Sequence, residues 1–133
     1  MIERDVGSFI RSVASIRPQA TAAATVNGVA IDRLGLMSGV VHAVTGAVTG
    51  APTSLTYTVS LQDSVDGSTG WAAVPDSTVV VSAANAEAEF NVNLDRTRRF
   101  IRVVGVVAFV GGTTPNLNIA ATVTLGGGSV KPV

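Results

Sequence analysis

The reactive side chains of this 133-residue chain are few. His42 is its only histidine, and the chain contains no cysteine. The sequence therefore excludes disulfides, thiolate metal sites and histidine clusters, and we expect neither a metal nor another cofactor. His42 lies in a valine-rich stretch, which favours a hydrogen-bonded structural histidine over a catalytic one. No Gly-x-Ser-x-Gly motif supplies a serine nucleophile for it to activate.

One pair of carboxylates has a spacing that is compatible with chemistry. Glu87 and Glu89 are two residues apart on a predicted strand, so they share a face, and paired carboxylates can hydrolyse glycosides. The same face continues as Asn91 and Asn93, a pattern typical of a solvated or partner-facing strip. We therefore predict that the protein is not an enzyme.

Three further aspartates, Asp63, Asp66 and Asp76, lie in predicted turns. The calcium-loop spacing of an EF-hand is absent. A cation held between these loops is one interpretation, and capping or turn hydrogen bonds by the carboxylates are the other. The second interpretation is the default for aspartates in turns.

The one basic cluster consists of Arg96, Arg98, Arg99 and Arg102. The formal net charge of the chain is zero, so no general field gathers nucleic acid or anionic lipid, and we expect neither as a partner. Two roles for the cluster stay open. The arginines either pair with Asp95 or Glu89 of the same chain or form ion pairs across a subunit interface.

The composition is low in charge. Charged residues make up 14% of the chain, against roughly 25% in ordinary soluble domains. This deficit indicates either a thick β core or an outer surface that other subunits cover. The longest apolar run, residues 103–110, is too short to span a bilayer, and the N-terminus shows no secretion signal.

The strongest structural signal lies in residues 55–74. Apolar and polar side chains alternate from Leu55 to Gln62, the period of a strand with one buried face. Residues 63–70 (DSVDGSTG) then concentrate turn formers, with Asp66-Gly67 as the reversal. The stretch predicts a β-hairpin that carries the only tyrosine, Tyr57, and the only tryptophan, Trp71, on apolar faces directed to the core.

Further strands are predicted on both sides of this hairpin. Asn27-Gly28 is a two-residue reversal signal, residues 87–94 alternate cleanly, and residues 98–110 are apolar on both faces, as in a central strand covered on both sides. Pro75-Asp76-Ser77 is another predicted turn. About eight strands in all indicate an all-β, antiparallel fold in residues 20–126, namely a β-sandwich, a jelly roll or a small barrel. The choice of a jelly-roll β-sandwich among these depends in part on the resemblance described below.

Residues 1–19 differ from the rest of the chain. Phe9, Ile10, Val13 and Ile16 would share one face of a short helix that Pro18 ends. The alternatives are a helix packed on its own domain and an arm laid on a neighbouring subunit. Residues 127–133 are predicted to be a flexible tail.

The residues from Leu61 to Trp71 (LQDSVDGSTGW) resemble a pattern of tailed-phage virion proteins, in which a strand ends in a turn of this composition before an aromatic residue. The arginine-led stretch 98–103 and the last strand, 117–125, are also similar to these proteins. With its size and N-terminal arm, the chain resembles the capsid cement or decoration proteins, which are jelly rolls.

The resemblance implies a structural virion protein, made in the host cytoplasm, that binds the exterior of an assembled capsid and cements neighbouring subunits. Its partners would be the major capsid protein and further copies of itself, as a homodimer or homotrimer. The alternatives are a tail or baseplate protein and a carbohydrate-binding β-sandwich. The predicted interface residues are Arg4, Phe9, Ile10, Arg11, Arg17, Arg98 and Arg102.

Overall fold

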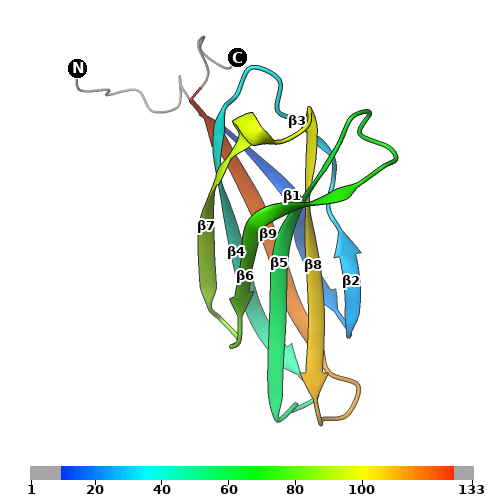
Figure 1. The fold of residues 1–133 in the computed structure, drawn as a ribbon. Helices are drawn as coiled ribbons and strands as arrows, with labels where there is room; N and C mark the ends of the chain where they lie inside the picture. Colours follow the sequence, from blue (N-terminus) through cyan, green and yellow to red (C-terminus); the bar gives the residue numbers. More distant parts are fainter. Residues whose placement is uncertain (1–9, 128–133) are drawn as a thin grey trace, which may run out of the picture.

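Residues 10–127 are described by the structure, a computed structural model, and they form an antiparallel β-sandwich (Figure 1). The prediction of an all-β fold is confirmed. One sheet has the strand order β1-β9-β4-β7, and the other has the order β2-β8-β5-β6, with β3 also paired to β8. The elements are β1 (Arg11–Thr21), β2 (Ala24–Asn27), β3 (Ile31–Asp32), β4 (Ser38–Thr49), β5 (Ser54–Ser64), β6 (Ala72–Val81), β7 (Glu87–Asn93), the 3-10 turn η2 (Leu94–Arg96), β8 (Phe100–Val110) and β9 (Asn116–Gly126).

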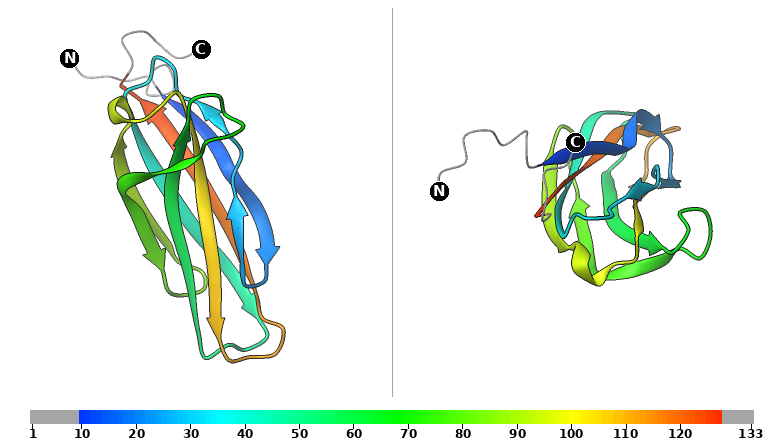
Figure 2. Two further views of the ribbon diagram at one scale, coloured as in Figure 1. Left: turned by 45° about the vertical axis from the view of Figure 1, so that its right-hand side comes forward. Right: turned by 90° about the horizontal axis from the view of Figure 1, so that it is seen from above.

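The core lies between the two sheets, which curve around one shared interior when viewed along the strands (Figure 2). Each central strand points every second side chain inward, and these side chains are apolar, so the alternation in the sequence becomes the inner face of a sheet. Tyr57 of β5 is completely buried, and its hydroxyl donates a hydrogen bond to the carbonyl of Ala120 at 3.2 Å. Burial raises the pKa of this hydroxyl well above its usual range.

The prediction of a helix near the N-terminus is wrong, because residues 11–21 form strand β1, paired with β9. The register with β9 shifts twice: β1 advances two positions against one of β9 between Ala14 and Ile16, and three against two between Ile16 and Gln19. The first of these bulges brings Val13 and Ile16, three residues apart, into contact with the same core, which mimics the spacing of a helix. Pro18 lies within the second bulge of this edge strand, where a proline does not interrupt a sheet.

Residues 11–19 of the predicted N-terminal arm therefore belong to the sandwich. The remaining part of that arm, residues 1–9, and the predicted tail beyond Gly127 lie outside the described residues. The predicted interface residues Arg4 and Phe9 lie there too.

Of two predicted chain reversals, one is confirmed and the other is wrong. The chain does reverse between β5 and β6, in the segment that contains Asp66-Gly67. Asn27-Gly28 does not reverse it, since β2 and β3 both pair antiparallel with β8. Gly28 serves a close approach instead, because a Cβ atom there would lie 2.2 Å from the Ser15 Oγ atom.

The predicted turn at Pro75-Asp76-Ser77 is also wrong, because these residues lie inside β6. They form an irregularity in the pairing with β5, where β6 advances five positions, from Ala73 to Thr78, while β5 advances two. Asp76 has a φ of 56°, in the left-handed region. These turn-forming residues therefore produce a bend within the strand and do not end it.

Ser15 joins the two sheets along the side where β1 and β2 meet. Its side chain is buried, and its Oγ atom donates to the carbonyl of Val29 at 3.1 Å and accepts from the backbone N–H of Val103 at 3.0 Å. The N–H of Val29 returns a bond to the Ser15 carbonyl at 2.8 Å. One hydroxyl thus satisfies backbone groups that the ladder leaves unpaired.

Among residues 10–127 there is no helix with the length and apolarity that a membrane crossing requires.

We expect Ser15→Ala to lower the free energy of unfolding by about 1–3 kcal/mol, because the buried N–H of Val103 loses its acceptor. Ser12→Ala is the matched control on the same strand. The Ser12 hydroxyl is exposed and bonds only the Thr124 hydroxyl, at 3.0 Å, so we expect a change within about 0.5 kcal/mol. Urea denaturation of both variants measures the difference, and equal losses would contradict the assigned role of Ser15.

Candidate interaction surface

The outer face of the β2-β8-β5-β6 sheet carries no charged residue over most of its length. Cross-strand partners place Thr25, Val106, Thr58 and Val80 in one row and Asn27, Val104, Ser60 and Thr78 in the next. We call this surface the outer Thr/Val face, and it consists of Thr25, Asn27, Ser54, Thr56, Thr58, Ser60, Thr78, Val80, Val104, Val106, Ala108 and Val110.

This face corrects the prediction that β8 is covered on both sides. Within the described residues only its inner side is covered by the other sheet, and the outward Val106 and Val110 are 40% and 62% exposed. Val80 of β6 is 49% exposed beside them. Exposed valines on a surface without charge are typical of a contact surface, because charged residues are depleted at the centre of protein interfaces.

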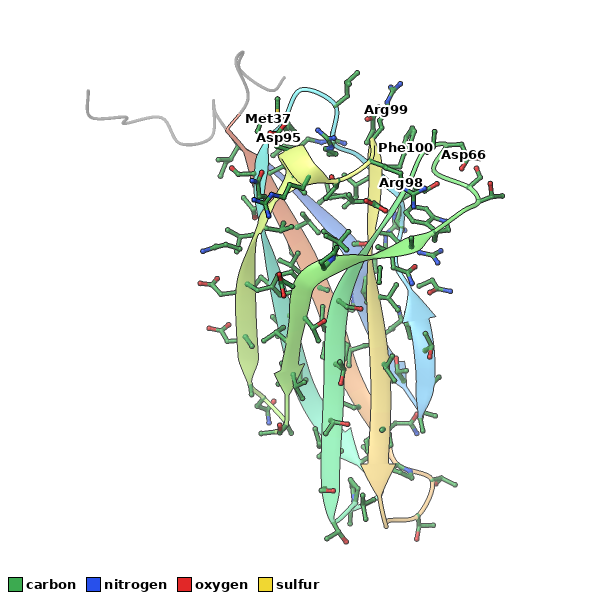
Figure 3. All side chains as sticks on the ribbon, in the orientation of Figure 1. Met37, Asp66, Asp95, Arg98, Arg99 and Phe100 are labelled. Atoms are coloured by element: carbon green, nitrogen blue, oxygen red, sulfur yellow. The ribbon has the colours of Figure 1, made fainter. Side chains whose placement is uncertain are left out.

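Charged side chains gather at one end of the sandwich instead, where Figure 3 labels Arg98, Arg99 and Asp66. Arg98 donates to the Asp63 carboxylate through its Nε and Nη2 atoms, at 3.0 and 2.9 Å. Its Nη2 atom also donates to the carbonyls of Asp63 and Gly70, at 2.7 and 2.8 Å. Arg98 thereby fastens the end of β5, the start of β8 and the loop between β5 and β6 to one another.

Arg99 forms a second pair, with Asp32 of β3, through two hydrogen bonds of 3.0 and 2.8 Å. These bonds to Arg99 are the main reason that the pKa of the Asp32 carboxyl lies below its usual value. The partners of the arginine cluster are therefore Asp63 and Asp32. The predicted pairing with Asp95 or Glu89 is not found in the described part of the chain.

The loop before Trp71 is organised by Asp66. Its carboxylate accepts hydrogen bonds from the backbone N–H groups of Ser68 and Thr69 at 2.9 and 2.8 Å, and from the hydroxyls of Thr69 and Ser64. The N–H of Thr69, followed by that of Ser68, holds the pKa of the Asp66 carboxyl well below its usual range. Asp66 thus acts through turn hydrogen bonds, as the default interpretation predicted.

Trp71 lies outside the core, contrary to the prediction. It is half-buried, and the guanidinium carbon of Arg102 lies 4.3 Å from the centre of its ring. Arg102 also donates to the Gln62 side-chain oxygen at 3.0 and 2.8 Å, and partial burial lowers the pKa of its guanidinium. Trp71 precedes β6, so the alternation of that strand does not decide where its side chain points.

The other predicted site residues lie apart from one another. Ile10 is 37% exposed near the ends of β4 and β9, Arg11 donates to the carbonyl of Asp32 at 3.5 Å, and Arg17 is exposed on β1. His42 lies on the outer face of the other sheet with its Nε2 atom 3.1 Å from a Glu87 carboxylate oxygen, so the predicted hydrogen bond is confirmed.

No group of three potential metal ligands occurs among residues 10–127. The outer Thr/Val face was not predicted from the sequence as a surface. Its signal was present in the outward threonines and serines of residues 54–60 and in the outward valines of residues 104–110.

Comparisons with known proteins identify the fold and no family. No family model and no curated protein matches the chain. Among solved structures, the PBSX exported protein XepA matches 92% of this chain at 16% identity with a TM-score of 0.62, and the chain spans only 39% of XepA. A Bacillus endospore appendage protein, from a family of disulfide-linked pili, matches 91% of this chain and 90% of its own at 19% identity, with a TM-score of 0.50. The SPBc2 prophage-derived protein YomS matches 87% of this chain and 91% of its own at 13% identity, with a TM-score of 0.49.

We expect the amide NMR signals of Ser68 and Thr69 to keep their folded positions to a pH below about 3.9, the ordinary pKa of an aspartate. The pKa of Asp66 is lower in the folded than in the unfolded state. Its stabilising contribution is therefore complete above the unfolded value and is lost as the pH falls through the folded value.

The Asp66→Asn variant is the control, because it lacks the titrating group and its signals should show no such step. A wild-type midpoint at or above 3.9 would contradict the role assigned to the carboxylate.

Proposed function

We propose that this chain is a structural protein of a tailed-phage virion and, more narrowly, a capsid cement protein that catalyses no reaction. The observation that carries the proposal is the outer Thr/Val face, on which exposed valines lie among uncharged polar side chains. Covering such a surface with another protein removes little charge from water, so it costs less than covering an ordinary surface. The phage-like segment from Leu61 to Trp71 supports the same assignment.

The similar solved structures agree with a role in an extracellular or virion assembly. XepA is an exported protein, and the Bacillus endospore appendages are pili. Those pili are disulfide-linked, whereas this chain has no cysteine. In an assembly that contains it, this chain would therefore be held without disulfides.

We also infer that the sandwich is a jelly roll. If β2 and β3 count as one strand, both sheets have four strands, and strands adjacent in sequence alternate between the sheets except at the β5-β6 hairpin. Such a chain crosses repeatedly from one sheet to the other, as two interlocked Greek keys do.

Cementing needs no chemistry beyond binding. A protein that binds the assembled lattice and not its separated subunits stabilises the lattice by mass action. Many copies on one shell add avidity, and the symmetry of the shell favours a dimer or trimer of this chain. The partners in this proposal are the major capsid protein and further copies, on the capsid exterior.

Two alternative functions would use features of the structure described above. A tail or baseplate location would use the outer Thr/Val face in the same way. A carbohydrate-binding role is favoured by the half-buried position of Trp71 beside Arg102 and Gln62, because sugars bind to aromatic rings flanked by polar planar groups. Co-sedimentation with heads or tails and binding to a glycan array, described below, distinguish these alternatives from capsid cementing.

We expect Val106→Arg to weaken binding to purified phage heads by at least about tenfold, because it places an unpaired charge in the centre of the outer Thr/Val face. Ala14→Arg is the matched control, since Ala14 is exposed on the outer face of the other sheet. Co-sedimentation with heads measures binding, and circular dichroism checks that both variants are folded.

The cementing proposal fails if the wild-type chain does not co-sediment with heads, or if both arginine variants bind equally well. Co-sedimentation with tails would support the tail alternative instead. Binding to a glycan array that Trp71→Ala abolishes without unfolding would support the carbohydrate alternative.

A further inference from the structure

The four sheet edges of the sandwich differ in how well they are protected against pairing with another strand. The edge strand β1 has two bulges and Pro18, and the edge strand β6 has Pro75 and the bend at Asp76. The edge strand β2 has only four residues. Prolines, bulges and shortness are the devices by which proteins prevent edge-to-edge association.

Strand β7 has none of these devices. It runs for seven residues without proline, and its register with β4 is continuous from Glu87 to Asn93. In Figure 1 it lies at the outer edge of its sheet, and β4 is its only paired neighbour among the described strands. Its two glutamates point outward and are the only charges on it, so they alone restrict which strand can pair with it.

The hydrogen-bonding groups at this edge can be assigned from the ladder. Just beyond its two ends, the N–H of Thr45 donates to the carbonyl of Ala86 and the N–H of Leu94 to that of Met37, both in the register of β4 and β7. Hydrogen-bonded pairs alternate along antiparallel strands, so Ala88, Phe90 and Val92 bond to β4. The backbone N–H and C=O groups of Glu87, Glu89, Asn91 and Asn93 therefore face away from β4.

We propose that this edge pairs with β7 of a second copy of the chain, antiparallel and centred on Phe90. In that register all seven residues are paired, Glu87 lies opposite Asn93 of the second copy, and Glu89 lies opposite Asn91. The four outward-facing residues of each strand would exchange about eight backbone hydrogen bonds with their partners. The two copies are related by a two-fold axis, and their β1-β9-β4-β7 sheets become one continuous sheet.

The charges select this register over its neighbours. A shift by two residues in one direction places Glu89 opposite Glu89, and a shift by two in the other leaves Glu87 without a strand partner, because β7 ends at Asn93. Like charges directly opposite each other are unfavourable. A shift by one residue places the inward side chains of one strand on the outer face of the other.

The inner side of the strand also fits a second copy. Phe90 is only partly buried and packs at the margin of the core. A hollow of about 300 Å³ lies between β6 and the C-terminal part of β7, lined in part by Val74, Val92 and Asn93. Phe90 would face Phe90 of the second copy in a pair without hydrogen bonds, where side chains approach most closely, and the new contact would cover its exposed part.

The test uses the full chain and sedimentation equilibrium over a range of concentrations. The wild type should form a reversible dimer. Asn91→Glu should weaken the dimer at least about tenfold, since the new glutamate of each copy lies opposite Glu89 of the other copy. Asn91→Lys should leave the dimer as tight or make it tighter, since it places a lysine opposite Glu89. The double variant Glu89→Lys with Asn91→Glu restores opposite charges and should return the dissociation constant to within a few-fold of the wild-type value.

A second measurement needs no variant. In hydrogen exchange, the amides of Glu87, Glu89, Asn91 and Asn93 should be protected in concentrated wild-type solutions and exposed in dilute ones. The proposal is overturned by a chain that stays monomeric at every concentration, by dimers that Asn91→Glu and Asn91→Lys affect equally, or by amide protection that does not change with concentration. It does not depend on the virion assignment, because all these measurements use the isolated chain.

Discussion

The burial of one apolar interior between two sheets is the constraint on which the whole molecule depends. Val41, Tyr57 and Ile101 are completely buried there, and the chain has no disulfide to replace their contribution. Burying apolar surface contributes roughly 25 cal/mol per Å², so a core of this kind suffices for a domain of this size. Tyr57 fits only because Gly105 leaves room for its ring, since a Cβ atom on Gly105 would lie 2.6 Å from the Tyr57 ring. Close packing therefore restricts which side chains the inner faces of the two sheets can carry. The side chains on the outer faces are not restricted in this way.

The way in which the chain closes this core also determines how its edges behave. Bulges let β1 follow the twist of β9 and turn its apolar residues inward, and the bend in β6 lets Ser77 donate to the carbonyl of Val74 at 2.6 Å. Both irregularities interrupt the row of backbone groups that a passing strand would need. Strand β7 needs no such adjustment, because its strict alternation already matches the core. Regularity in the sequence therefore leaves one edge open to association.

Two of the arginines form ion pairs with aspartates of the same chain. Arg98 and Arg99 are held by Asp63 and Asp32 at one end of the sandwich, where they connect loops and strand ends. The Arg99–Asp32 pair is exposed, and such pairs contribute little to the free energy of unfolding, whereas the Asp63 side chain is only 14% exposed. These charged side chains lie at one end of the sandwich, and the outer Thr/Val face carries no charge. The absence of charge on the outer Thr/Val face is what the proposed contact with other subunits requires.

The sequence by itself determined the fold class and the strands with uninterrupted alternation, residues 55–62 and 87–93 among them, because a period of two is a local property of each strand. It did not determine β1, whose bulges imitate a helical spacing, nor the position of Trp71, which lies outside any strand. The tertiary structure decided the strand order and the arginine partners, since Asp63 and Asp32 approach Arg98 and Arg99 only after distant strands pair. Contacts between residues that are far apart in sequence depend on this pairing, and the pattern of single strands does not contain it.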